Sequence, residues 1–65
     1  MPQKTREAIR DLRRAEFIHL HTKGSHRKFY HPKANLTVIV SGGLGDDVPK
    51  YLEQQIKDYI QRSKQ

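Results

Sequence analysis

The spacing of apolar and polar positions changes along the chain, and these changes predict five elements of secondary structure. From Thr5 to Ala15 the apolar residues recur three and four positions apart, which is typical of an amphipathic helix. Thr5 is the expected N-cap of this helix. Residues 17–22 alternate between apolar and polar types and predict a strand. A turn at 23–25 then leads into a second strand at 26–31.

The second half of the chain predicts a third strand and a second helix. A turn at 32–35 precedes residues 36–40, which form the most β-prone stretch of the sequence. A glycine-rich loop follows, after which Asp46 or Asp47 can cap a helix that tolerates Pro49 in its first turn. The apolar stripe that we expect this helix to bury consists of Val48, Leu52, Ile56, Tyr59 and Ile60.

The predicted order is helix, strand, strand, strand, helix in a single domain over residues 1–65. The short links between strands favour antiparallel pairing. Two amphipathic helices need one apolar surface to cover, so both are expected on one face of a three-stranded antiparallel sheet. This α+β layout is shared by double-stranded-RNA-binding domains, although a fold alone does not define a function.

Composition and charge limit the kinds of site and partner that the chain can have. The 65 residues include no cysteine, which excludes disulfides and cysteine-ligated zinc. The chain has neither a long apolar run nor the pattern of a signal peptide, so we expect a cytoplasmic protein without a membrane partner. Residues 1–33 contain nine Lys and Arg and three Asp and Glu, whereas residues 34–65 contain four of each kind. The basic first half indicates a surface that meets phosphate groups.

Alternation along the second predicted strand sorts its side chains onto two faces. If Phe29 packs under the helices, Arg27 and His31 lean the same way. The residues that alternate with these three then point to the open face. The residues of the open face would be His26, Lys28 and Tyr30. They offer a proton-transfer group, a cation and an aromatic surface, which together suit an RNA substrate. The expected RNA contacts are Lys23, Arg27, Lys28 and Tyr30.

A short signature in the same region resembles a known family. Gly24-Ser25-His26 is followed by an aromatic residue at Phe29 and then by His31-Pro32. This pattern is similar to the G-S-H…H-P signature of HicA (YcfA-like) toxins, and the order of elements agrees over essentially the whole chain. The resemblance implies a fold like that of double-stranded-RNA-binding domains, mRNA interferase activity and neutralisation by a HicB antitoxin. It also implies that His26, which follows Gly-Ser, is the catalytic histidine.

The chain departs from the family pattern at two positions. Glu16 stands where the family often has glycine, before the aromatic residue that opens the first strand. Lys28 stands in the middle of the second strand, where the family is often apolar. Glu16 bears on how the first helix ends, whereas Lys28 indicates either an additional RNA contact or a different assignment of faces.

The reaction that we expect is transesterification of RNA without a metal or other cofactor. His26 would take the proton of a ribose 2′-OH, which then attacks the adjacent phosphorus and leaves a 2′,3′-cyclic phosphate. The leaving 5′-oxygen could be protonated by Tyr30, by His31 or by water, and the sequence leaves this choice open. One general base contributes roughly 10²–10⁴ in rate, so the enzyme should be slow.

Two alternatives accompany this reading. Strict alternation would place His19 and His21 on one face, where an H-x-H pair can bind a metal. No carboxylate or cysteine stands at ligand spacing, so we expect them instead to line the open face or to lie in solvent. The alternative function is a non-catalytic basic RNA-binding module, which would need lysines and arginines but not His26.

Overall fold

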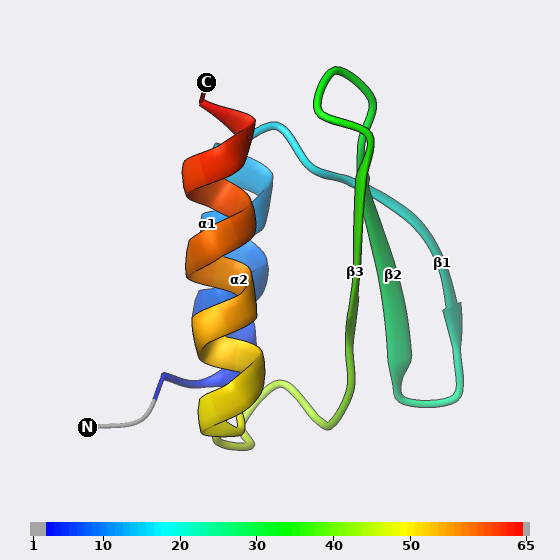
Figure 1. Ribbon diagram of the computed structural model, residues 1–65. Coiled ribbons are helices and arrows are strands. Elements are labelled where there is room, and N and C mark those ends of the chain that lie inside the picture. The colour runs from blue at the N-terminus through cyan, green and yellow to red at the C-terminus, as the bar shows by residue number, and fades with distance from the viewer. Residues whose placement is uncertain (1–2, 65) are drawn as a thin grey trace.

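A computed structural model describes residues 3–64 as two helices packed against one three-stranded sheet (Figure 1). The elements follow the predicted order, and both strand pairs are antiparallel in the spatial order β1-β2-β3. Figure 1 shows both helices on the same side of the sheet, so the predicted α+β arrangement is confirmed. The elements are α1 (Thr5–Arg14), β1 (Ile18–Lys23), β2 (His26–His31), β3 (Leu36–Val40) and α2 (Lys50–Ser63).

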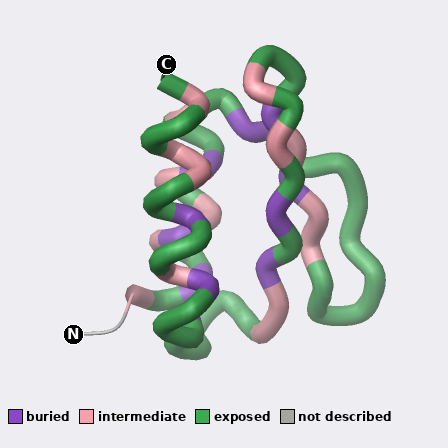
Figure 2. Tube along the Cα trace, viewed as in Figure 1, coloured by how far each residue is buried: buried purple, intermediate pink, exposed green. Residues whose placement is uncertain are grey.

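The core lies between the helices and the face of the sheet that they cover, which we call the inner face. Phe29 in β2 is 0% exposed and pairs with Val38 of β3. Figure 2 shows buried segments of the helices turned toward buried segments of β2 and β3. The predicted stripe of α2 is confirmed, with its last two apolar residues, Tyr59 and Ile60, partly buried. The other buried apolar residues are Ala8, Leu12, Phe17, Val40, Val48, Leu52 and Ile56.

β1 is exposed along its whole length, in contrast to the other two strands (Figure 2). A bulge interrupts its pairing, so that His19 pairs with Phe29 whereas His21 pairs with Lys28. One extra residue changes the face to which the following side chains point. His19 therefore lies on the inner face and His21 on the opposite face, and the expectation that they share a face is wrong.

α1 ends in a Schellman motif that requires a left-handed backbone at Glu16, where φ is 73°. The Glu16 amide donates to the carbonyl of Arg13 at 3.0 Å, and the Phe17 amide donates to the carbonyl of Leu12 at 2.9 Å. These two bonds define the motif, and its apolar contact is formed by Leu12 and Phe17, which are both buried in the core. Glycine adopts this conformation without strain, so the glutamate occupies a position that favours glycine.

α1 begins with Lys4 as its N-cap residue, so the prediction of Thr5 at that position is wrong by one residue. The Thr5 amide donates to the carbonyl of Asp46 at 2.9 Å, and the Arg6 amide donates to the carbonyl of Leu44 at 3.1 Å. The Thr5 hydroxyl donates to the same Asp46 carbonyl at 3.1 Å. Carbonyls of the loop between β3 and α2 thus satisfy amides that a helix start leaves without partners.

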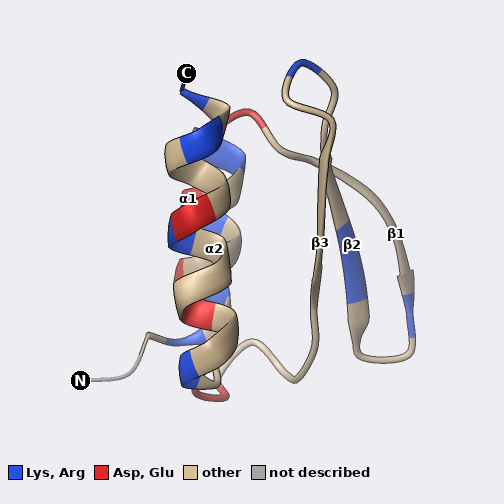
Figure 3. Cartoon of the chain, in the orientation of Figure 1, with Lys and Arg blue, Asp and Glu red and all other residues tan. Residues whose placement is uncertain are grey.

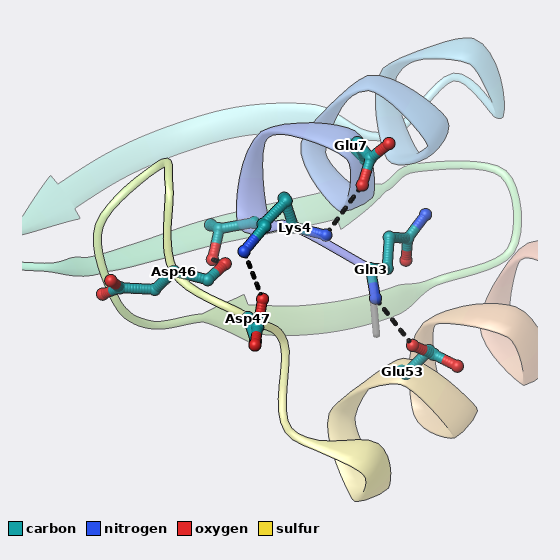
Figure 4. Close-up of polar contacts among 7 residues, drawn as sticks. Gln3, Lys4, Glu7, Asp46, Asp47 and Glu53 are labelled. Carbon is teal, nitrogen blue, oxygen red and sulfur yellow. Dashed lines mark hydrogen bonds and ion pairs between the residues drawn. The ribbon is translucent and has the colours of Figure 1, made fainter. Parts of the chain in front are cut away.

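The predicted aspartate cap of α2 is also wrong, because Pro49 is the N-cap residue and offers no side-chain bond. The Asp47 carboxylate accepts a hydrogen bond from Lys4 Nζ at 2.6 Å (Figure 4). The Asp46 carboxylate accepts one from the Gly43 amide at 2.8 Å. Asp47 thus pairs with the residue that caps α1, while Asp46 closes the loop that covers the start of that helix.

Candidate active site on the open face of the sheet

The face of the sheet turned away from the helices, which we call the open face, carries alternate residues of β2. Phe29 and His31 are buried on the inner face, with 0% and 3% of their surface exposed. Alternation then places the remaining side chains of interest on the open face, as the sequence predicts. They are His26, Lys28 and Tyr30, of which His26 is exposed and the other two are half-buried.

A two-residue turn positions His26 at the first residue of the central strand. Lys23 pairs with His26, so Gly24 and Ser25 are the only residues between the strands. Gly24 has a φ of +61°, whereas Ser25 has no positive φ, which is the pattern of a type II′ turn. A Cβ at Gly24 would meet nothing within 4 Å. The positive φ, and not a lack of room for a side chain, is therefore the reason that glycine suits this position.

Four side chains gather on the open face beside this turn, and we call them the hairpin cluster. Lys23 stands directly opposite His26, and His21 stands directly opposite Lys28. Directly opposed Cβ atoms are about 4.5–5.5 Å apart and diagonal neighbours about 7–8 Å. Both lysines therefore lie within reach of a group held by the two histidines. The sequence predicts that His21 lines the open face or lies in solvent but gives it no role in the site, and the structure places it on the open face beside Lys28.

The strands carry positive but no negative side chains. Figure 3 shows Lys and Arg on the hairpin strands, and Asp and Glu only on the helices and their connecting loops. Within residues 3–64 the charges of Lys23 and Lys28 therefore face no carboxylate on the sheet. This arrangement attracts an anionic phosphodiester to the open face.

Tyr30 and His31, the two predicted proton donors, lie far from His26. Tyr30 is four residues further along β2, which at about 3.3 Å per residue separates the two backbones by about 13 Å. Its hydroxyl donates to Asn35 Oδ1 at 3.2 Å. His31 is on the inner face, where its Nδ1 accepts from the Ala34 amide at 3.0 Å. Neither side chain reaches a phosphate held at His26.

Arg27 lies on the inner side of β2, opposite Val40, and is half-buried. Its Nη1 donates to the carbonyl of Gly42 at 2.8 Å, which ties β2 to the loop after β3. A guanidinium has five N–H donors, so this bond leaves others available. The predicted phosphate contact of Arg27 stays a prediction, to which the structure adds a role in holding the loop.

His19 and His21 cannot share a metal, since they lie on opposite faces of β1. The His19 ring stacks on Phe29 at a centroid distance of 5.1 Å, and its Nε2 lies 2.8 Å from Thr22 Oγ1. Across residues 3–64, no three His, Asp or Glu side chains come together as metal ligands. No helix in this part of the chain has the length and apolar character to span a membrane.

The fold and the open face define a class of protein: a small α+β domain, laid out like a double-stranded-RNA-binding domain, whose free sheet face carries lysines and histidines. The chain has no match among curated proteins. A family profile described as HicA toxin of bacterial toxin–antitoxin matches residues 5–64. Because that match covers nearly the whole chain, this protein belongs to the HicA toxin family. It is thus the toxin of a toxin–antitoxin system, and its partner is an antitoxin.

Proposed function

We propose that this toxin is a metal-independent endoribonuclease that cleaves mRNA, with His26 as its general base. The observation that carries the proposal is the position of His26, exposed on the open face with Lys23 opposite and Lys28 two residues along the strand. Membership of a family whose members are generally mRNA-cleaving toxins supports it. The cytoplasm, where mRNA is found, is the expected location.

The proposed reaction uses the ribose as its own nucleophile. His26 accepts the proton of the 2′-OH while the 2′-oxygen attacks the adjacent phosphorus. Lys23 and Lys28 offset the charge that develops on the phosphoryl oxygens. The bond from phosphorus to the 5′-oxygen breaks, that oxygen takes up a proton from a second donor, and a 2′,3′-cyclic phosphate and a 5′-hydroxyl remain. DNA is inert because it has no 2′-OH.

Tyr30 and Arg27 serve binding in this proposal. Tyr30 lies on the open face about 13 Å along the strand from His26, so its half-buried ring suits contact with a neighbouring base. Arg27 lies at the margin of the sheet, where the donors that Gly42 does not use can meet a backbone phosphate.

The test is cleavage by the wild type and by His26→Ala, with EDTA present, on a structured and an unstructured RNA. We expect the wild type to release cyclic phosphate ends and to leave DNA intact. His26→Ala should lose roughly 10²–10⁴ in rate while it still binds RNA. His19→Ala is the matched control, since it removes a histidine from the inner face of the same hairpin. RNA binding without cleavage by any of these proteins would favour the alternative, a non-catalytic RNA-binding module.

A HicB-type antitoxin is the partner that we propose, and occlusion of the open face is its proposed mode of action. The open face of residues 3–64 carries lysines and no carboxylate, so an acidic partner surface complements it. Addition of the antitoxin should therefore protect the RNA and shield His26 from chemical modification. A complex that leaves His26 reactive and still cleaves RNA would disprove occlusion.

A further inference from the structure

We propose that His21 is a second catalytic residue, the general acid that protonates the leaving 5′-oxygen. The inference rests on the proposed function and completes it, because one histidine does not readily serve as base and acid in a single step. It assigns the proton donor that the sequence leaves open among Tyr30, His31 and water.

The bulge in β1 is the structural reason for this assignment. Without it, His21 would follow His19 onto the inner face, beside Phe29. With it, His21 stands opposite Lys28 on the open face and diagonal to His26. Both histidines are exposed, so a substrate can contact their rings without any movement of the core.

A diagonal pair fits the geometry of phosphoryl transfer. The entering 2′-oxygen and the leaving 5′-oxygen occupy opposite sides of phosphorus, so the base and the acid must stand on opposite sides of one phosphate. Diagonal neighbours are about 7–8 Å apart, which leaves room for a phosphodiester between the two rings. Lys23 and Lys28 occupy the other diagonal of the hairpin cluster, where they can hold the non-bridging oxygens.

The groups around His21 include two lysines and no carboxyl group among the described residues. Lys28 faces it from β2, Lys23 stands two residues along β1, and Ile39 of β3 lies beyond Lys28. The three strands carry no Asp or Glu, and the α-helices lie on the far side of the sheet (Figure 3). An imidazolium is an established general acid, whereas Lys23 and Lys28 serve here as cations for the phosphate.

The proton balance of the step is simple. His26 receives the proton of the 2′-OH as the bond from the 2′-oxygen to phosphorus forms. The bond from phosphorus to the 5′-oxygen breaks, and the imidazolium of His21 gives its proton to that oxygen. Exchange with water afterwards returns both histidines to their starting states, so no other reactant is needed.

The experiment compares two leaving atoms at a mapped cleavage site. The wild type first defines that site on RNA, and a DNA strand is then made with one ribonucleotide there. The bridging 5′-atom is oxygen in one substrate and sulfur in the other. A thiolate leaves without protonation, because thiols are far more acidic than alcohols.

His21→Asn should lower kcat on the oxygen substrate by roughly 10²–10³ and change KM by no more than about threefold. On the sulfur substrate it should recover to within about fivefold of the wild type, whereas His26→Asn should remain slow on both substrates. His21→Arg keeps a positive charge, but its guanidinium does not give up a proton in proteins, so it should behave as His21→Asn does. His19→Asn, on the same strand but the inner face, should cleave both substrates as the wild type does.

Three results would overturn the assignment of His21 alone. These are wild-type activity of His21→Asn, restored activity of His21→Arg, or equal losses of His21→Asn on both substrates. Failure of the wild type to cleave any RNA would instead overturn the proposed ribonuclease function, and His21 as its acid with it. Thermal unfolding of each variant verifies the fold, which substitutions at these exposed positions should leave intact.

Discussion

The two faces of β2 are built from alternate residues of one six-residue strand, yet they have different roles. The inner face places Phe29 and His31 in the core, with 0% and 3% exposure. The open face presents His26 and Lys28 to solvent in the hairpin cluster. Adjacent residues therefore carry stability and chemistry separately, so the two properties can be changed one at a time.

The two edge strands extend this contrast. β3 alternates between buried and exposed residues, as a strand that covers a core does, whereas every residue of β1 is exposed. A domain of 65 residues buries only about 60% of its unfolded surface, so each core position matters to its stability. β1 contributes little to the core, which leaves its side chains free for a substrate.

The largest loss of stability is expected from a substitution at the centre of the inner face. Phe29→Ala should lower the free energy of unfolding by about 3–5 kcal/mol, because it leaves a cavity under both helices. Such a loss is comparable to the whole stability of a marginal domain, so much of the variant should be unfolded. Ile39→Ala on β3, where 52% of the residue surface is exposed, should cost less than about 1 kcal/mol. Urea unfolding of both variants measures the difference, and similar losses would contradict the separation of faces.

The neighbours Arg27 and Lys28 sharpen the comparison, because one substitution can be made on each face. Arg27→Met removes the hydrogen bond to Gly42 and should lower the free energy of unfolding by about 1–2 kcal/mol. Lys28→Met should change stability by less than about 0.5 kcal/mol but weaken RNA binding and reduce its salt dependence by about one counterion. Urea unfolding and RNA titration at several salt concentrations test the pair. A stability loss from Lys28→Met as large as that from Arg27→Met would argue against this division.

A gain of stability is expected where α1 turns toward the sheet. Glu16→Gly should raise the free energy of unfolding by about 0.5–1 kcal/mol, since it relieves the left-handed backbone at φ 73°. Arg13→Gly, which introduces the same residue within the helix, should instead lower it by about 0.5–1 kcal/mol. Thermal unfolding distinguishes the signs, and RNA cleavage should be unchanged in both variants. A loss of stability in Glu16→Gly would refute the assigned strain.

The smallest change in stability is expected at Glu53, which lies on α2 and is remote from the open face. The amide of Gln3 donates a hydrogen bond to its carboxylate (Figure 4), and the ammonium of Lys57 donates another. Both bonds lower the pKa of Glu53 below the ordinary 4.5. A lowered pKa in the folded state means that the stabilisation is present above pH 4.5 and is lost as the pH falls through the lowered value. Glu53→Gln should therefore unfold at a slightly lower temperature than the wild type at pH 7. Melting curves at falling pH should converge, and a constant gap would exclude this ionisation as the cause.

The candidate site was predictable in part. His26 and Lys28 could be placed on the open face because β2 is regular and Phe29 marks its inner side. For His21 the alternation predicts the open face only together with His19, and the separation of the two histidines depends on how β1 pairs with β2. His31 was a candidate donor in the sequence, but its burial and its bond to the Ala34 amide remove it from the site.

The sequence by itself determined the five elements, their order and the layer arrangement, because helical and alternating periodicities follow from local backbone geometry. It also predicted a turn at 23–25 before His26, which the structure narrows to Gly24-Ser25 because Lys23 pairs with His26. Only the tertiary structure decided the helix caps, which depend on the loop after β3 reaching back to the start of α1. It alone decided which histidines meet on the open face, because strand register is a property of two paired segments and not of either one.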